Sequence, residues 1–588
     1  MGDDSFLGTT RGRITAGLIL LVLIGLGLFV WQTVSASRAL LDARERADRV
    51  QTLIKAGDFD GAARELQRLR KSTEQAHDST DGILWDTGRH IPYLGRNIGA
   101  VQTVSEVLDS ATEDNAPVAL ELSRAVDEGR FRPVDGRIDL AAVKELTPQV
   151  SRAARSIDAA AAELDDIHPD RLVFPFNDLV GDLQEQVAKA RSAADATASS
   201  FELMPQMLGE DGPRDYLLMI QNPAELRSTG GLPGSLAILH ADKGRLTMGW
   251  QGSAGDVNRG GFGGPVVQLA KDTLQQYGLT PATDFRDLNF TPDFPEAAQI
   301  AKTMVERKED VKLDGVVSID PIALGYLMRG TGPVVVSNVT LRSSNVAAAL
   351  LNQTYQALQD PIAQDDFFED VARKVFDSVM SGQGDQQQAI KGLAEGAGQH
   401  RVLLWSADEK EQAAIAGTAV AGELTGPSKD VAEVGMYLND SLAGKVDYYL
   451  QYRSAVSAVD CRNDDSQDLR VSVAFTSQVP QDFARLSPYI VGTGQFAPKG
   501  SITFNLRIYA PLGGEITGLK VNGETRSVTA DRHEDRQVAI LPISLEPGEE
   551  LNLTADIRTG KGQDGAGIFN FTPGMVPAGN GVKITSAC

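Results

Sequence analysis

An uncharged apolar run near the N-terminus constrains the fold of this chain more than any other sequence feature. No charged residue occurs from Ile14 to Ser37, and ITAGLILLVLIGLGLFVWQTV supplies about the 20 apolar positions that a helix needs to cross a bilayer. Trp31 lies near the end of the run, where an amphipathic ring suits a membrane interface. The run predicts a transmembrane helix at residues 14–35, preceded by a cytoplasmic tail at residues 1–13.

A cleavable signal peptide is the alternative interpretation of this run. The small residues Val34, Ser35 and Ala36 offer a cleavage site, but the run exceeds the roughly 7 to 15 apolar residues of a signal core. Arginines flank both ends and are more numerous after the run, which argues against a cytoplasmic N-terminus, although long domains translocate regardless of flanking charge. We expect a single-pass protein of the cell membrane with its C-terminal domain extracytoplasmic.

The two cysteines bear on the same question. Cys461 and Cys588 both fall in the last part of the chain, and two distant partners in one domain suit a disulfide formed outside the cytosol. Two buried free thiols are the alternative. Zinc is disfavoured, because the pair lacks any CxxC spacing.

The charge balance excludes one class of partner. The net charge is −23, and no dense Lys/Arg run appears outside the N-terminal flank. Nucleic-acid binding needs clustered basic side chains to displace counterions. The sequence therefore predicts no nucleic-acid partner.

Three changes of pattern divide the rest of the 588 residues. Residues 36–204 have apolar residues at helical intervals and predict a helical stalk or bundle, which offers a surface for protein partners. Residues 205–435 alternate predicted strands with helices such as Glu296 to Lys308, and predict a layered α/β domain. Residues 436–588 alternate apolar and polar residues and predict an immunoglobulin-like β-sandwich. The predicted fold class is multidomain α+β.

The segment NPAELRSTGGLPGS, from Asn222 to Ser235 and here called the signature segment, is the leading candidate site. We expect a strand, a glycine loop and a hairpin, with Arg227 beside Gly230 and Gly231. A guanidinium next to exposed backbone N–H groups can bind phosphate or carboxylate. The structural alternative is an ion pair of Arg227 with Glu225 or Asp256 that fixes the loop. Asn222 and Glu225 complete this group of candidate ligand-binding residues.

Two further segments carry candidate residues. The run GDVNRGGFGGP adds Asp256 and Arg259 beside four glycines, and lacks the GK[ST] ending of a nucleotide-binding loop. It predicts a loop that gates a groove, or one that is merely flexible. The segment DFRDLNFTPDFPEAA gathers carboxylates that suit a divalent cation, although capping of a helix by Asp293 ahead of Pro295 explains much of it. Six scattered histidines form no catalytic motif.

Several of these motifs together resemble a known bacterial family. QNPAELRSTGGLPGS, NFTPDFPEAA, DGVVSIDPIALGYLMRGTGPV and LLNQTYQ, in this order, resemble the family catalogued as domain of unknown function 4012. The resemblance implies an envelope-facing protein with a membrane helix, a helical stalk and an α/β domain.

The α/β segment also resembles, more distantly, the LytR-CpsA-Psr family of envelope glycopolymer transferases. The resemblance implies that Arg227 contacts pyrophosphate, that Asp256 holds Mg²⁺ and that Asn289 lies at a lipid-phosphate groove. The sequence departs from that family because Ala254-Gly255 stands in place of Pro-Arg, and Asp287 in place of Lys. Two positive charges are thereby missing from a pyrophosphate site.

These observations give one leading function and two alternatives. The leading one is a membrane-anchored envelope protein that binds an anionic cell-wall or polyprenyl-pyrophosphate-linked glycopolymer, without evidence of turnover. The first alternative is a glycopolymer phosphotransferase in which Arg227 and Arg259 stabilise developing charge and Asp256 holds Mg²⁺. The second is a non-catalytic scaffold that works through its helical stalk and sandwich.

Overall fold

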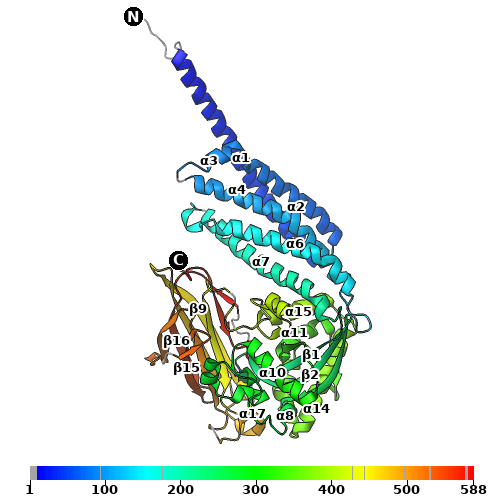
Figure 1. The fold of residues 1–588 in the computed structure, drawn as a ribbon. Helices are drawn as coiled ribbons and strands as arrows, with labels where there is room; N and C mark the ends of the chain where they lie inside the picture. Colours follow the sequence, from blue (N-terminus) through cyan, green and yellow to red (C-terminus); the bar gives the residue numbers. More distant parts are fainter. Residues whose placement is uncertain are drawn as a thin grey trace. The chain divides into compact units, whose positions relative to one another are not determined.

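The computed structural model describes residues 10–588, except residues 93, 175, 427, 443, 496, 529, 530 and 577–580. The side chains of residues 10–27, 29, 30, 170 and 192 are also outside the description. The chain divides into two compact units, one made of residues 1–131 and 141–204 and the other of residues 132–140 and 205–588. Each unit is described by itself (Figure 1).

The first unit is built from helices. Its helices are α1 (Thr10–Lys55), α2 (Phe59–Thr80), α3 (Ile83–Gly88), α4 (Gly95–Ser110), a π-helical turn (Ala111–Asn115), α5 (Ala116–Asp127), α6 (Leu140–Asp165), a 3-10 turn (Pro169–Arg171) and α7 (Phe176–Met207). The break between α1 and α2 follows from the sequence, because Gly57 adopts φ 74° and Asp58 caps α2 by accepting a hydrogen bond from the Gly61 N–H. The two helices pack through a core that includes Ala43, Ala62 and Leu66.

The structure corrects the prediction of a transmembrane helix at residues 14–35. Among the described residues, no helix is long and apolar enough to cross a membrane, so the predictions of a single-pass membrane location and an extracytoplasmic C-terminal domain are not supported. The apolar run opens α1, which continues unbroken to Lys55, and the charged part of this helix, from Arg38 onward, packs against α2. Arg46 donates to Glu65 over 3.0 Å, and Ser72 donates to Asp42 over 2.5 Å. Of the predicted tail, residues 1–9 lie outside the described residues.

The second unit begins with a mixed five-stranded sheet. Its strand order is β3-β2-β1-β4-β7, with β1 and β4 parallel and the other neighbours antiparallel. The strands are β1 (Arg214–Arg227), β2 (Gly230–Asp242), β3 (Arg245–Ser253), β4 (Gly315–Ile319) and β7 (Val402–Ser406). The β2–β3 turn is tight because Lys243 and Gly244 both have positive φ.

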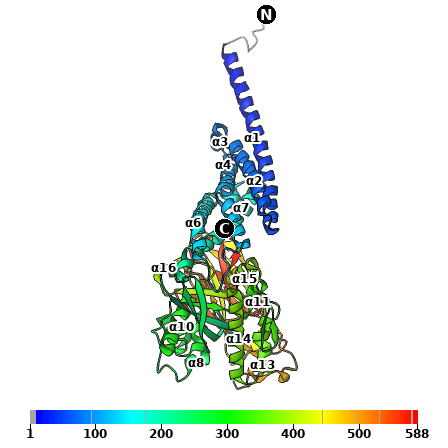
Figure 2. The same ribbon diagram turned by 90° about the vertical axis from the view of Figure 1, so that its right-hand side faces the viewer.

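Helices cover both faces of this sheet (Figure 2). They are α8 (Ala254–Asn258), α9 (Lys271–Tyr277), α10 (Phe294–Glu309), α11 (Pro321–Thr331), α12 (Val346–Ala348), a π-helical turn (Ala349–Gln353), α13 (Thr354–Ala357), α14 (Pro361–Met380), α15 (Gln386–Gly398) and α16 (Glu409–Ile415), with 3-10 turns at Thr280–Ala282 and Phe285–Phe290 and a β5–β6 ribbon (Val334–Val336, Val339–Leu341). α10 packs on one face through Phe294, Ala301 and Met304, and α14 contacts β2 and β3 from the other. Asp293 caps α10 as the capping alternative predicted, because it accepts from the Glu296 N–H at 3.0 Å.

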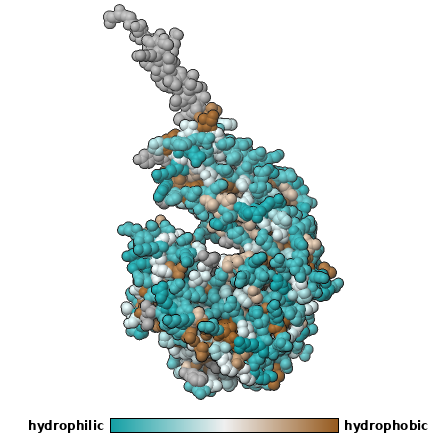
Figure 3. Space-filling view, in the orientation of Figure 1, coloured by the Kyte–Doolittle hydropathy of each residue, from teal (hydrophilic) through white to brown (hydrophobic). Residues whose placement is uncertain are grey.

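The chain ends in two sheets that share one hydrophobic core. One sheet has the order β13-β12-β16-β10-β9 and the other β14-β15-β11-β8-β17-β18. The strands are β8 (Glu433–Asp440), β9 (Leu450–Cys461), β10 (Gln467–Ser477), β11 (Ile502–Tyr509), β12 (Glu515–Val521), β13 (Glu524–Thr525), β14 (Asp531–His533), β15 (Arg536–Leu545), β16 (Glu550–Arg558), β17 (Gly567–Phe571) and β18 (Val582–Ile584); the short helices are 3-10 turns at Val446–Tyr449 and Phe483–Arg485 and α17 (Pro488–Val491). Cys461 and Cys588 form a disulfide, as predicted. On the face drawn in Figure 3 most residues are hydrophilic.

Candidate functional site

The signature segment forms the tip of the β1–β2 hairpin rather than a glycine loop. β1 runs to Arg227, β2 starts at Gly230, and only Ser228 and Thr229 form the turn. Gly231 is required by close approach, because a Cβ there would lie 2.2 Å from the carbonyl carbon and oxygen of Asn222. The glycines therefore allow two backbones to pack, which the sequence did not distinguish from an anion-binding loop.

A bulge in β1 displaces three residues from the hairpin. Asn222 pairs with Leu232 and Leu226 with Gly231, so residues 223–225 have no partner in β2. Asn222 holds the bulge at both ends of its amide: Oδ1 accepts from the Ala224 N–H at 3.0 Å and Nδ2 donates to the Tyr355 hydroxyl at 2.8 Å. The bulge re-aims Glu225, whose carboxylate pairs with Lys445.

Arg227 is enclosed rather than presented to a ligand. Its side chain is 6% exposed; Nη2 donates to Asp287 Oδ1 at 2.9 Å and lies 3.5 Å from Glu225 Oε1. Its guanidinium also lies over the Phe290 ring, 4.8 Å from the centroid. The structural alternative, an Arg227–Glu225 ion pair, is thus present, whereas Asp256 pairs elsewhere.

The hairpin tip docks into the sandwich. Leu226 is 1% exposed and belongs to the sandwich core. Its N–H donates to Asp447 Oδ2 at 2.9 Å, and the Ser228 N–H donates to Asn439 Oδ1 at 2.9 Å. The Thr572 hydroxyl donates to the Ser228 carbonyl at 3.0 Å. The signature segment is therefore the joint between the α/β sheet and the sandwich.

Asn289 serves the same joint. It is fully buried, and its Nδ2 donates to Thr229 Oγ1 and to the Gly231 carbonyl, both at 2.9 Å. Gln221 Oε1 accepts from the Gly231 N–H at 2.8 Å, directly under Gly230. The side-chain amides of Gln221 and Asn289 thus hold the turn in place. Asn289 has no exposed surface to offer a ligand.

Asp256 and Arg259 lie outside this network. Asp256 is the third residue of α8 and completes a capping box with Ser253, while its other oxygen binds Arg259 at 2.5 Å. The Arg259 side chain is 80% exposed. Lys308 holds the following glycine-rich loop by donating to the carbonyls of Arg259 and Gly261. Over the described part of the chain, no group of three His, Cys, Asp or Glu side chains is placed to hold a metal ion.

A pocket of about 550 Å³ opens beside the bulge. Its walls are mainly apolar. The apolar lining residues are Ile220, Leu232, Pro321, Leu324, Leu350, Leu351, Tyr355, Phe368, Val371, Ala372, Pro488 and Tyr489. They come from β1, β2, α11, the helical segment 346–357, α14 and α17, so the pocket forms where helices of the sheet's second face meet the sandwich. An apolar cavity with few polar groups is the usual form of a ligand site.

The polar groups of the pocket converge on Lys445. Glu225, Asn222 and Tyr355 line the pocket with it, and the Lys445 ammonium lies 5.5 Å from the Tyr355 ring centroid. Burial opposes the charge of Lys445, but the Glu225 carboxylate outweighs it and raises the Lys445 pKa. Burial likewise raises the pKa of Tyr355 to about 12, so its hydroxyl stays protonated. Arg286 also lines the pocket and pairs with Asp284.

Two buried carboxyls lie behind this group. Asp447 and Asp440 each have one oxygen without a hydrogen-bond partner in the described structure, Oδ1 and Oδ2 respectively. Burial, with the nearby Glu225 carboxylate, raises the pKa of Asp447 to about 7. Burial and Asp447 raise the pKa of Asp440 well above its ordinary value. The cluster therefore holds protons that exposed carboxyls release.

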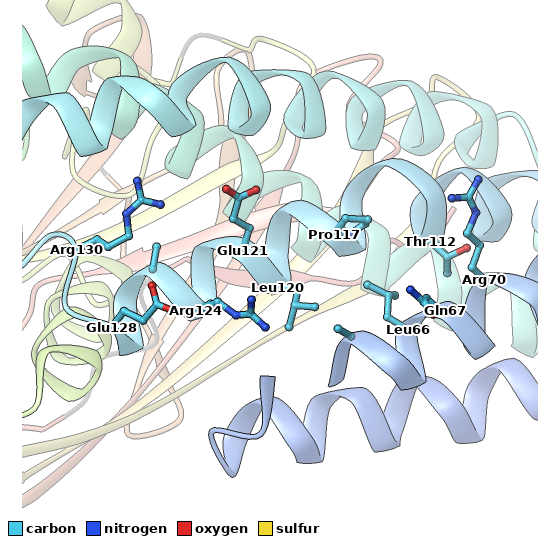
Figure 4. Close-up of a pocket in the computed structure, with 12 residues that line it drawn as sticks. Leu66, Gln67, Arg70, Thr112, Pro117, Leu120, Glu121, Arg124, Glu128 and Arg130 are labelled. Carbon is cyan, nitrogen blue, oxygen red and sulfur yellow. The ribbon is translucent and has the colours of Figure 1, made fainter. Parts of the chain in front are cut away.

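The first unit has a hollow of its own, about 510 Å³ between α2 and α5 (Figure 4). Leu66, Pro117 and Leu120 line it, with Arg70 and Arg124 at its rim. Both arginines are engaged, Arg70 with Glu113 and Arg124 with Asp60 at 3.0 Å. The walls of this hollow are also mainly apolar, but its two arginines are already paired with carboxylates, so its chemistry selects no ligand class.

The structure thus separates the predicted site residues into three groups. Asn222 and Glu225 line the pocket; Arg227, Gly230, Gly231 and Asn289 are buried in the joint; Asp256 and Arg259 lie on and after α8. Sequence reasoning missed Lys445 and Tyr355. Tyr355 is the next-to-last residue of the motif LLNQTYQ, which carries the family resemblance, and Lys445 lies in SLAGKVDYY, a stretch without a recognisable motif.

Comparisons with known proteins agree with the sequence resemblance in one segment. No curated protein and no solved structure is similar enough to this chain to count as a match. Residues 211–355 match the family model described as protein of unknown function (DUF4012). The matched segment contains the hairpin, the bulge, α11 and Tyr355. Residues 211–355 are therefore similar to the DUF4012 family.

Proposed function

We propose that this protein binds an amphipathic ligand, an apolar chain that ends in an anionic head such as the diphosphate of a polyprenyl-linked glycopolymer. The pocket beside the β1 bulge is the binding site. The observation that carries the proposal is the pairing of a mainly apolar cavity of about 550 Å³ with a lysine, 15% exposed, among its lining residues. The volume lies within the range common for small-molecule sites.

The apolar walls are suited to a hydrocarbon chain. Leu324, Leu350, Phe368 and Val371 all line the pocket, and each buried methylene of a ligand gains about 0.8 kcal/mol. These side chains also pack against one another or against the core behind them, so the cavity is preformed. A purely polar ligand would leave most of this surface without a partner.

The head group is assigned to the Lys445 end of the pocket. Lys445 makes one ion pair, with Glu225, and an ammonium carries three donors. The Tyr355 hydroxyl accepts from Asn222 and keeps its own proton to donate. An anionic oxygen beside both groups gains charge-assisted hydrogen bonds in a largely water-excluded place.

The proposal moves the ligand contacts away from Arg227 and does not include turnover. Arg227 is already satisfied by Asp287 and Glu225, and Asp256 caps a helix. The groups that the transferase alternative requires are therefore engaged in other contacts. No observation in the described residues favours that alternative over binding.

The test is a titration of the full chain with a short-chain polyprenyl diphosphate, the matching prenyl alcohol and inorganic pyrophosphate. We expect saturable binding of the diphosphate, weaker binding of the alcohol and the weakest binding of pyrophosphate. Leu324→Trp, which fills the cavity, should weaken both prenyl ligands. The charge-neutral double variant Lys445→Met/Glu225→Gln should weaken the diphosphate and leave the alcohol unchanged.

The control is Lys520→Met, which removes an exposed lysine of β12 and should bind like wild type. Thermal melting of every variant shows whether it is folded. If none of the three ligands saturates the wild-type protein, the binding proposal is wrong and the scaffold alternative gains weight. If Arg227→Met abolishes diphosphate binding while the double variant does not, the head group lies at Arg227 instead.

A further inference from the structure

Strand β9 forms a free edge of the sandwich. In the described part of the chain, β10 is the one strand that pairs with it. Its stretch SAVSAV, from Ser454 to Val459, contains no charge, no proline and no glycine. Natural edge strands are usually blunted by charges, prolines or short length, so a long uncharged edge is a template for another strand.

The two faces of β9 differ in a regular way. Arg453, Ala455 and Ser457 are exposed on the outer face of the sandwich, whereas Val456 and Ala458 pack against its core. This alternation fixes the register of β9 on β10. It also determines which side chains of β9 would lie beside an added strand on each face of the sheet.

A bulge at Val459 brings a second charge to the outer face. Ala458 pairs with Leu469 and Asp460 with Asp468, so Val459 is the extra residue. Without the bulge, Asp460 would point to the opposite face from Arg453. With it, a cation and an anion stand on one face at the two ends of an uncharged stretch.

We propose that β9 is a self-complementary interface that pairs antiparallel with β9 of a second copy of this chain. The two-fold axis passes through Val456, which is opposite the same residue of the other copy. Ala455 then lies opposite Ser457, and Ser454 opposite Ala458. Arg453 of each copy lies opposite Asp460 of the other, because the bulge shifts the register by one residue at that point.

Charge complementarity selects this partner and this register. In its own sheet Asp460 is directly opposite Asp468, and like charges in that arrangement destabilise a sheet. Asp468 has Arg462 and Arg558 as partners, whereas within the described part of the chain neither Asp460 nor Arg453 forms an ion pair. In the proposed pairing, Arg453 of each copy pairs with Asp460 of the other, so the same ion pair forms twice, as a two-fold interface requires. A slip of two residues removes both ion pairs.

The test is the oligomeric state of the full chain by sedimentation velocity over a concentration series. Eight residues a side form a small interface, so we expect a dimer whose population rises with concentration. Arg453→Asp and Asp460→Arg should each raise the dissociation constant about tenfold or more, because two ion pairs become two repulsions. The double variant Arg453→Asp/Asp460→Arg should restore the wild-type constant.

The matched control is Arg485→Asp, a charge reversal at an arginine that is 85% exposed and lies in a 3-10 turn. It should leave the dissociation constant unchanged. A monomer at every concentration overturns the proposal, and so does a dimer that both single variants leave intact. This result is independent of the pocket, because no residue of β9 lines it.

The register has a separate test. Mixing Ala455→Cys chains with Ser457→Cys chains should give a mixed disulfide under mild oxidation, since these positions are opposite each other across the axis. Two Cys residues bond only when their Cα atoms are within about 7 Å. If the mixed disulfide forms no faster than it does between Cys variants of exposed Thr517 and Glu524, the proposed register is wrong.

Discussion

The backbone N–H of Leu226 donates a hydrogen bond to Oδ2 of Asp447 over 2.9 Å and joins the tip of the β1–β2 hairpin to the sandwich. The two residues are 221 positions apart in sequence. The Leu226 side chain packs in the sandwich core beside this bond. Specific packing and a buried hydrogen bond thus act at one point of the joint.

Truncating this side chain should destabilise the second unit. Leu226→Ala removes buried methyl groups from the sandwich core, and such changes cost about 2 to 5 kcal/mol. Chemical unfolding followed by tryptophan fluorescence measures the effect. Leu279→Ala, at a leucine that is 51% exposed, is the control and should change stability little. Equal effects of the two variants would contradict the packing role of Leu226.

Arg227 should contribute to the stability of the fold rather than to ligand binding at the surface. Arg227→Met leaves Asp287 and Glu225 with one partner fewer in a buried place, and breaking such a pair costs about 3 to 5 kcal/mol. Arg227→Met/Asp287→Asn should lose less than the single variant, because the unpaired carboxylate is gone. Arg259→Met, at an 80% exposed arginine, should be nearly neutral. Thermal melting of the three proteins checks the order.

Two glycines of the signature segment should respond differently to the same change. A Cβ at Gly231 lies 2.2 Å from backbone atoms of Asn222, so Gly231→Ala must force the hairpin apart. A Cβ at Gly234 has no neighbour closer than the Leu232 side chain at 3.6 Å, so Gly234→Ala should be tolerated. The expected loss is several kcal/mol for the first variant and under about 1 kcal/mol for the second. Similar melting temperatures for both would refute the close approach.

Stability should fall as the pH rises toward neutrality. The pKa of Asp447 is raised to about 7 in the fold, whereas an exposed Asp titrates near 3.9. The folded protein therefore binds more protons than the unfolded chain between these values. Stability from this group is complete below about pH 4 and is lost by about pH 7. Asp447→Asn keeps the acceptor for Leu226 and cannot ionise, so it should flatten the slope of melting temperature against pH in this window. An unchanged slope would mean that a group other than Asp447 binds the proton.

Local patterns predicted local structure well. The helix expected at Glu296 to Lys308 is α10, and Asp293 caps it. Periodicity and capping act over a few residues, so one sequence contains the information. The turn at Lys243-Gly244 follows the same rule.

The site was harder to predict because its partners are distant in sequence. Arg227 pairs with Asp287, which lies 60 positions away, and Leu226 is buried by strands more than 200 positions away. Lys445 becomes a candidate site residue only in the folded protein, because β8 and a 3-10 turn bring it beside Glu225. The transmembrane prediction was wrong, since no helix among the described residues is long and apolar enough to cross a membrane.

The insertion of Leu226 into the sandwich core also bears on how the second unit comes apart. The α/β sheet cannot separate from the sandwich without exposing that side chain and leaving Asp447, Asn439 and Thr572 without their backbone partners. Calorimetry should therefore record the two as a single cooperative transition. A division between residues 435 and 436 would cut β8 and would remove Leu226 and Val434 from the sandwich core.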